Sequence, residues 1–183
     1  MKLFTLAPVS LLALAALAIA APLKTDPAKS TVSATFKQMN VPVEAKFKKF
    51  SAAIDYDAAK PDAAKASVDI ETASLDLGEA EMNKEVAKKE WFNAAQFPKA
   101  SFVSSSIKAA GAGKLTVSGK LTIKGKTTDV TFPLTVKVEG GKQVFEGAVP
   151  IKRLTYNIGE GEWKDTSTVA DDVVIKFRVS AAQ

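Results

Sequence analysis

The chain has 183 residues and a formal net charge of +5, and it contains neither cysteine nor histidine. The lack of cysteine excludes disulfides, thiol catalysis and cysteine-held iron–sulfur clusters, and the lack of histidine excludes Ser-His-Asp chemistry and histidine-ligated zinc or haem. The positive charge is mild and spread along the chain, so it indicates a solvated surface rather than a dedicated anionic partner.

The first twenty residues are typical of a targeting segment. Lys2 supplies a positive start, residues 11–19 form a short, alanine-rich apolar run, and Ala18-Ile19-Ala20 is a small-x-small cleavage pattern. We therefore expect a signal peptide over 1–20, cleavage after Ala20, and export to the periplasm. Residues 21–183 then form one domain, which is long enough to bury a substantial core.

Most of the chain after this leader alternates apolar and polar residues with a period of two. Successive side chains of a strand point to opposite faces, so each such stretch predicts a strand with one apolar and one polar face. Short strands at this spacing indicate an all-β sandwich or barrel. The expected strands are 31–37, 43–48, 52–56, 68–71, 101–107, 115–123, 129–138, 144–151 and 173–179.

One segment between the strands breaks this pattern. Residues 79–90 are rich in Ala, Glu, Lys and Met and contain neither Gly nor Pro, which favours an α-helix. Met82 and Val86 are four positions apart and can share one face of that helix. We expect a short helix at 79–90 that plugs or covers one mouth of a barrel.

The alternation is clearest in two neighbouring stretches. The odd positions of 115–123 are apolar or glycine, and the even positions of 130–138 are all apolar. The break Lys124-Gly125-Lys126 between them predicts a tight antiparallel hairpin. A sheet with one apolar face must cover that face or curl around it, so the interior of the expected barrel is either packed solid or hollow.

Several short motifs, taken in order, resemble the YceI-like family, a lipocalin-like group of bacterial proteins associated with polyisoprenoid binding. No single motif is diagnostic, but their order and spacing together are specific. The motifs are TDPAKS (25–30), IDYD (54–57), EWFN (90–93), FPKASF (97–102), VSGKLTIKG (117–125) and IGEGEW (158–163).

The resemblance implies an all-β fold, an antiparallel eight-stranded lipocalin-like barrel with one short helix near the barrel mouth. It also implies a periplasmic location and an elongated apolar cavity for the tail of a quinone or a polyprenyl phosphate. The chain departs from a common family pattern where many members have His in place of Lys29, and where many have arginines in place of residues 81–85. A family role of those positions in holding a polar head is therefore not assigned to this chain.

From the apolar faces and the resemblance we expect a non-catalytic binding protein that holds a hydrophobic or amphipathic molecule for transport, storage or sequestration. A polyisoprenoid lipid is the expected guest, with no cofactor, no catalytic residue and no metal ligand. Each lining residue could equally belong to a solid core. The predicted lining is Phe36, Phe47, Ile54, Ile70, Phe102, Leu121, Ile123, Phe132, Leu134, Ile175 and Phe177.

Three further aromatic residues are candidates for the mouth of the cavity. Amphipathic rings suit a border between water and an apolar interior, and Trp91, Phe92 and Trp163 flank the expected helix and a glycine-rich loop. For Trp91 and Phe92, simple docking of the helix onto the barrel is the alternative.

Two other functions stay open from the sequence. The acid pairs Asp55 and Asp57, or Glu160 and Glu162, could serve a cell-envelope hydrolase, although solvated turn acids are the simpler interpretation. A filled barrel could act as an accessory or stress-response partner.

The lysines and aromatic residues also bear on which partners the protein could bind. Two lysine groups, 46, 48 and 49 or 84, 88 and 89, could touch a phosphate head or make transient contact with a membrane surface. A homodimer stays open as well. Nucleic-acid binding is not expected, because the chain lacks an aromatic platform with interleaved basic residues.

Overall fold

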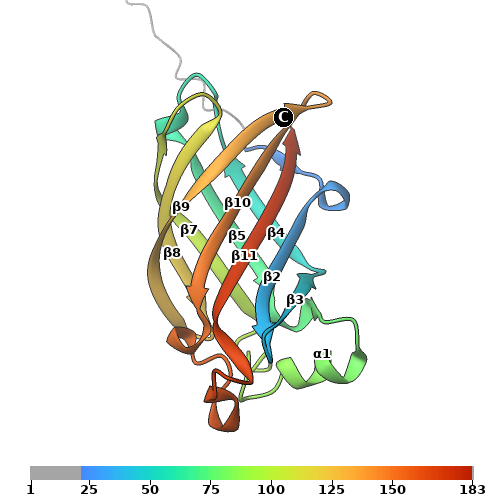
Figure 1. Cartoon of the computed structure of the whole chain (residues 1–183). Coiled ribbons are helices and arrows are strands. Elements are labelled where there is room, and N and C mark those ends of the chain that lie inside the picture. The colour runs from blue at the N-terminus through green and yellow to red at the C-terminus, as the bar shows by residue number, and fades with distance from the viewer. Residues whose placement is uncertain (1–21, 183) are drawn as a thin grey trace, which may run out of the picture.

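A computed structural model describes residues 22–182, so the predicted signal peptide at 1–20 lies outside the described residues. The described chain forms one antiparallel sheet of 11 strands that curls into an elongated, incompletely closed barrel (Figure 1). The longer strands are β2 (Thr31–Gln38), β3 (Val41–Phe47), β4 (Phe50–Asp55), β5 (Lys65–Glu71), β7 (Lys99–Ala109), β8 (Lys114–Ile123), β9 (Lys126–Glu139), β10 (Lys142–Lys152) and β11 (Val169–Ala182). Two strands, β1 (Lys24–Thr25) and β6 (Leu75–Asp76), have only two residues each.

In the described part of the chain, helical structure is limited to short segments. The α-helix α1 (Ala80–Val86) lies at the same end of the barrel as the segment that follows β10 (Figure 1). Within residues 22–182, no helix is both long and apolar enough to cross a bilayer. The 3-10 helices are η1 (Pro27–Lys29), η2 (Pro61–Ala63), η3 (Thr72–Ser74), η4 (Arg153–Tyr156) and η5 (Gly161–Lys164).

The sheet has a seam where the barrel wall is not hydrogen-bonded. Strands follow the order β4-β5-β7-β8-β9-β10-β11-β2-β3-β6, and β1 pairs with the end of β11. Among the described residues no ladder joins β3 to β4, although Leu23 bridges to Ile54 near one end of the seam.

The antiparallel lipocalin-like class is confirmed. The expected count of eight strands is wrong, because β3 and β4 stand as separate strands on either side of the seam and β1 and β6 are short additions.

All nine strands expected from the alternation are present, most of them longer than predicted. On β8 the inward positions are buried, from Leu115 at one end to Ile123 at the other. The turn that follows has Lys124 at φ 48° and Gly125 at φ 74°, the two left-handed residues of a type I′ turn. Because the twist of that turn matches the twist of paired strands, the predicted hairpin forms here.

The helix is shorter than the expected 79–90, because it ends at Val86. The chain then folds back on itself: the amide of Phe92 donates to the carbonyl of Val86 at 3.0 Å, and Asn93 takes a left-handed φ of 48°. This turn brings Trp91 and Phe92 against the barrel interior, whereas a continued helix would have carried them along its axis.

Candidate functional site

The barrel interior holds two apolar chambers. The helix-end chamber has a volume of about 110 Å³ and is bordered by Val86, Trp91 and Phe92. The far chamber has a volume of about 120 Å³ and is bordered by Tyr56 and Phe145. The two chambers adjoin inside the barrel, because they share the lining residues Val68, Ile70, Phe102, Leu121 and Ile175.

The structure places all eleven residues predicted for the lining on the walls of these chambers. They share the inward face of their strands, as the period of two requires. Phe36, Phe47 and Ile123 border the helix-end chamber, Ile54, Phe132, Leu134 and Phe177 border the far chamber, and Ile70, Phe102, Leu121 and Ile175 border both.

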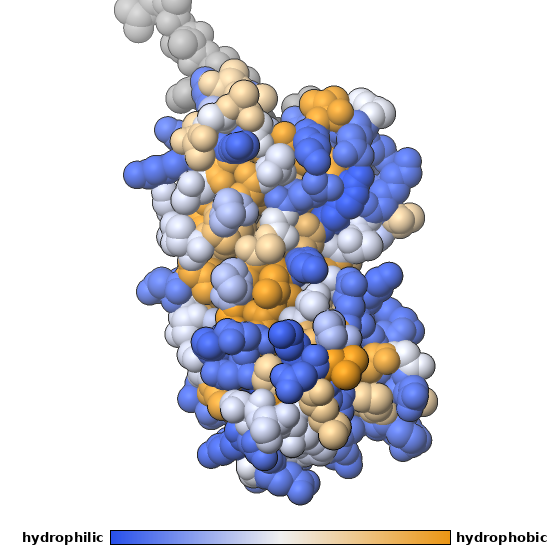
Figure 2. Space-filling model, viewed as in Figure 1, coloured by the Kyte–Doolittle hydropathy of each residue, from blue (hydrophilic) through white to orange (hydrophobic). Residues whose placement is uncertain are grey.

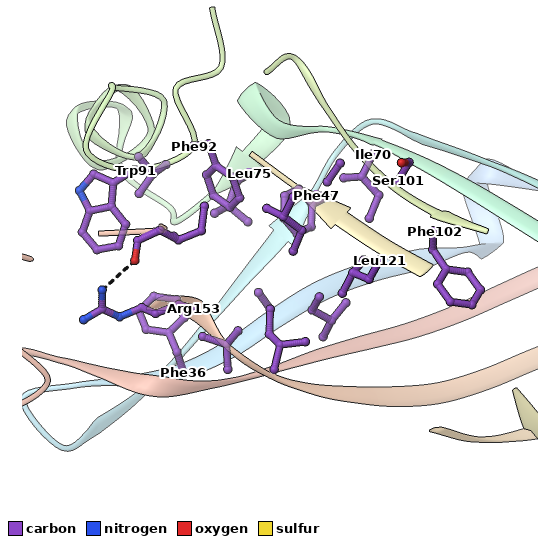
Figure 3. Close-up of a pocket in the computed structure, with 18 of the residues that line it drawn as sticks. Phe36, Phe47, Ile70, Leu75, Trp91, Phe92, Ser101, Phe102, Leu121 and Arg153 are labelled. Carbon is purple, nitrogen blue, oxygen red and sulfur yellow. Dashed lines mark hydrogen bonds between the residues drawn. The ribbon is translucent and has the colours of Figure 1, made fainter. Parts of the chain in front are cut away.

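The three aromatic residues expected at the mouth separate into two roles. Trp91 and Phe92 line the helix-end chamber, and Trp91 lies at the opposite end of it from Phe102 (Figure 3). Trp91 is only 9% exposed, so it closes the chamber instead of standing at a wet border. Trp163 does not line either chamber; its ring packs 5.3 Å from that of Trp91, centroid to centroid.

Arg153 is a buried charged residue of this site that the sequence interpretation missed. It follows β10, is 2% exposed, borders the helix-end chamber, and lies with its guanidinium carbon 5.9 Å from the centroid of the Trp91 ring. Its five N–H groups are all used by main-chain carbonyls. Nε donates to Ala170 (3.1 Å), Nη1 to Ile158 (2.8 Å) and Gly159 (3.3 Å), and Nη2 to Trp163 (2.7 Å) and Val169 (2.7 Å).

This arrangement makes Arg153 a fixed positive charge and not a vacant hydrogen-bond donor. Burial lowers the pKa of Arg153, and the nearby charge of Asp171 offsets only part of this effect. The signal in the sequence that could have pointed to Arg153 is its rarity, because it is one of only two arginines among 25 basic residues. A planar guanidinium has five donors and can satisfy five carbonyls at once, whereas a lysine ammonium has only three donors.

A buried lysine stabilises the same end of the barrel from the outer side. Lys124, at the β8–β9 turn, is 9% exposed, and its ammonium donates to the carbonyls of Lys89 (2.7 Å) and Asn157 (2.8 Å) and to the carboxylate of Glu160 (2.9 Å). The hydrogen bond from Lys124 lowers the pKa of Glu160. Three segments that are distant in the sequence are therefore tied together by one side chain.

The acids considered for a hydrolase do not form a catalytic pair in a cavity. Glu160 is ion-paired with Lys124 and lines neither chamber, and Glu162 is exposed. Asp57 accepts a hydrogen bond from the amide of Ala59 (2.8 Å) within its own turn, while Asp55 borders the far chamber. These contacts are those of turn-stabilising and ion-paired acids.

On the face of the barrel drawn in Figure 2, apolar residues are visible between polar and charged side chains, most clearly in the middle of the barrel. Lys29, which stands where many family members have His, is exposed at the end of η1. Lys84 and Lys88 pair with glutamates three positions before them on the α1 side.

The comparisons with known proteins agree with this geometry. A family model described as the YceI-like domain matches residues 23–181. The crystal structure of Burkholderia cenocepacia BcnA is 54% identical, aligns over 87% of this chain and 100% of that chain, and has a TM-score of 0.85.

More distant relatives match in part or in fold only. A UPF0312 protein of Pseudomonas putida is 38% identical over 94 residues, 51% of this chain and 49% of that protein, so the match spans about half the length of the curated relatives. A structure described as a polyisoprenoid binding domain from Saccharophagus degradans has a TM-score of 0.70, over 90% of this chain and 98% of that chain. At 17% identity, it shows the shared fold alone.

Proposed function

The chain belongs to the YceI-like domain family, and from this membership and the two apolar chambers we propose that it is a non-catalytic binding protein for a long apolar or amphipathic molecule. The guest is of the polyisoprenoid class, such as a quinone or a polyprenyl phosphate, and its tail occupies the barrel interior. The leader pattern at 1–20 supports binding in the periplasm, for transport, storage or sequestration.

The observation that carries the proposal is a void inside the barrel where a solid core would otherwise be. Nearly all of the residues that border the chambers are apolar, and the two chambers lie next to each other along the barrel, with five lining residues in common. An apolar cavity of this kind stays dry and accepts hydrocarbon. The solved domain from Saccharophagus degradans that shares this fold is described as binding polyisoprenoid, which suits the same use of the interior.

The chamber volumes set the length of tail that fits without rearrangement. A dry cavity of about 150 Å³ takes one benzene ring, so each chamber takes roughly one five-carbon isoprene unit and the pair roughly two. Burying a methylene contributes about 0.8 kcal/mol, so two units contribute roughly 6–8 kcal/mol before ordering costs are subtracted. Micromolar binding corresponds to about 8 kcal/mol. Tight binding of a longer tail therefore requires side chains to move.

The test is tail-dependent stabilisation of the purified mature protein. Ubiquinone-0, which has the head alone, should leave the midpoint of thermal unfolding unchanged, and ubiquinone-2 should raise it in proportion to the logarithm of its concentration. Native mass spectrometry of protein purified from its own periplasm should show bound lipid. Only ligand-free protein, with no stabilisation by either quinone, would overturn the proposal.

A pair of variants locates the binding in the chambers. Ala100→Leu adds three carbon atoms to the wall of the helix-end chamber. Lys99→Leu places the same side chain at the neighbouring position, on the exposed outer face of β7. We expect the first variant to lose the response to ubiquinone-2 and the second to keep it. Equal responses in both variants would place the guest elsewhere.

A further inference from the structure

Aromatic and glycine residues alternate across five neighbouring strands at the level where the chambers meet. Phe102 on β7, Phe132 on β9 and Phe177 on β11 face the interior, with Gly119 on β8 and Gly147 on β10 between them. Phe132 packs edge-on against both neighbours, with centroid separations of 5.5 Å to Phe102 and 5.8 Å to Phe177. We call these five residues the aromatic–glycine layer.

Each glycine of the layer is covered by one of the rings. A Cβ on Gly119 would lie 2.6 Å from two atoms of the Phe102 ring, and a Cβ on Gly147 would lie 2.9 Å from Cε1 of Phe177 and closer still to its Cζ. Neither glycine has a positive φ, so the backbone conformation does not require glycine at these positions. Glycine is needed here for space, because it lets the ring lie against the wall and leaves the centre of the barrel open.

We propose that the aromatic–glycine layer determines how long a hydrocarbon chain the cavity accepts, by holding Phe102 and Phe177 away from the path between the two chambers. The inference rests on the proposed function and extends it to tail-length selectivity. Phe102 borders both chambers, whereas Phe132 and Phe177 border the far chamber only. In this proposal a tail of one unit occupies the helix-end chamber alone, and a longer tail passes Phe102, which borders both chambers, and lies beside Phe177.

Gly147 is the better of the two glycines for a test. A Cβ on Gly119 would also clash with the main-chain carbonyl of Val103, so that substitution would move the wall itself. The nearest main-chain atom to a Cβ on Gly147 is the carbonyl oxygen of Pro133 at 3.2 Å, and the nearer atoms all belong to the Phe177 ring. Gly147→Ala should therefore displace the ring into the far chamber with little change to β10.

The experiment compares two probes that share one head, ubiquinone-1 and ubiquinone-4, by their dissociation constants. In Gly147→Ala we expect the affinity for ubiquinone-1 to stay within twofold of wild type and the affinity for ubiquinone-4 to fall at least tenfold. Ala148→Ser, which adds one atom to the solvent face of the same strand, should change neither affinity more than twofold. Circular dichroism and thermal unfolding confirm that each variant is folded.

A double variant tests whether ring displacement is the cause. Phe177→Leu added to Gly147→Ala removes the displaced ring and should restore ubiquinone-4 binding to within threefold of wild type, a non-additive result. The layer would have no role in length selectivity if Gly147→Ala weakened both probes equally or neither, or if the double variant failed to recover. Failure of the wild-type protein to bind either probe would instead overturn the proposed function.

Discussion

The two chambers are closed in different ways. The far chamber lies among regular strands whose main-chain groups are paired in ladders, and its wall consists of packed apolar side chains such as Leu115 and Phe132. The helix-end chamber is closed largely by turns and short helices, whose main-chain carbonyls are not paired with a neighbouring strand. Arg153 and Lys124 donate to seven main-chain carbonyls there. Buried backbone must be hydrogen-bonded, so the irregular end needs buried cations and the regular part does not.

The difference shows how a largely apolar interior can be closed at one end by charged residues. The cations lie behind or at the rim of the apolar lining, and their charges are spread over carbonyl dipoles. The comparison also predicts where stability is most sensitive. Removing a buried polar side chain should lower the free energy of unfolding most at the helix end, and truncating an apolar side chain should lower it most in the strand wall.

The largest expected effect is the loss of stability on replacing Arg153, with the other arginine of the chain, Arg178, as the control. Arg153→Met leaves five carbonyls without their charged donor, and each hydrogen bond to a charged group contributes about 1.5–3 kcal/mol. We expect the free energy of unfolding, measured in urea, to fall by about 4 kcal/mol or more. Arg178→Met, which removes partly exposed ion pairs to Glu139 and Glu146, should cost about 1 kcal/mol or less. Equal losses would contradict the assigned role of Arg153.

Leu115→Ala should produce the next largest loss, in the wall of the far chamber. Leucine-to-alanine changes in cores cost about 2–5 kcal/mol. Leu115 is 5% exposed but faces a void, so its side chain has fewer packing contacts to lose. The free energy of unfolding should therefore fall by only about 2 kcal/mol. Urea unfolding measures the change, with Lys114→Ala as a control on the exposed position beside it. A loss near 5 kcal/mol would indicate a solid core at this level.

A smaller effect is expected from the buried hydroxyl of Tyr156 at the helix end. Tyr156 is 2% exposed, and its hydroxyl is hydrogen-bonded to that of Thr128. Tyr156→Phe should lower the free energy of unfolding by about 1 kcal/mol. Thr128→Val should cost a similar amount, and the double variant should cost less than the sum, because both remove the same bond. Simple additivity of the two losses would rule out the pairing.

The most pH-dependent effect concerns Asp76, the last residue of β6, which lies close to the start of α1 in the sequence. Its carboxylate is ion-paired with Lys48 (2.7 Å) and accepts from Asn83 (2.9 Å) and the amide of Gly78 (3.1 Å). These contacts lower the pKa of Asp76 from 3.8 to about 2. The folded protein therefore binds fewer protons than the unfolded chain between these values, and the stabilisation is full above about pH 5 and lost as the pH falls through about 2.

Urea midpoints measured from pH 6 down to pH 2 test this dependence. Asp76→Asn should flatten the acid limb relative to wild type, since the asparagine does not titrate. Asp129→Asn, on the exposed outer face of β9 beside Lys120, serves as the comparison. An acid limb in Asp76→Asn as steep as that of the wild type would show that other carboxylates determine it.

The fold and much of the lining could be predicted from the sequence, because they depend on local pattern. The period of two assigns Leu121 and Ile123 to the same face as Leu115 whatever the rest of the chain does, and Lys124-Gly125 suits the one turn that joins two such strands. The resemblance then narrowed the architecture, although it suggested eight strands where the seam leaves β3 and β4 apart.

The contacts at the helix end could not be predicted in the same way. Arg153 bonds to carbonyls between 5 and 17 positions away, and Lys124 to groups 33 to 36 positions away, and neither spacing follows a periodic pattern. The early end of α1, which turns Trp91 inward, likewise depends on what the turn packs against.

By itself, then, the sequence determined an antiparallel all-β barrel, its inward-facing side chains and the apolar character of its interior, because side-chain direction on a strand depends only on the pleat. Only the tertiary structure decided that the interior is hollow, that it is divided at Phe102, and that two glycines make room for rings from neighbouring strands. Those properties depend on how side chains from strands far apart in the chain meet across a few ångströms, and no local pattern encodes that distance.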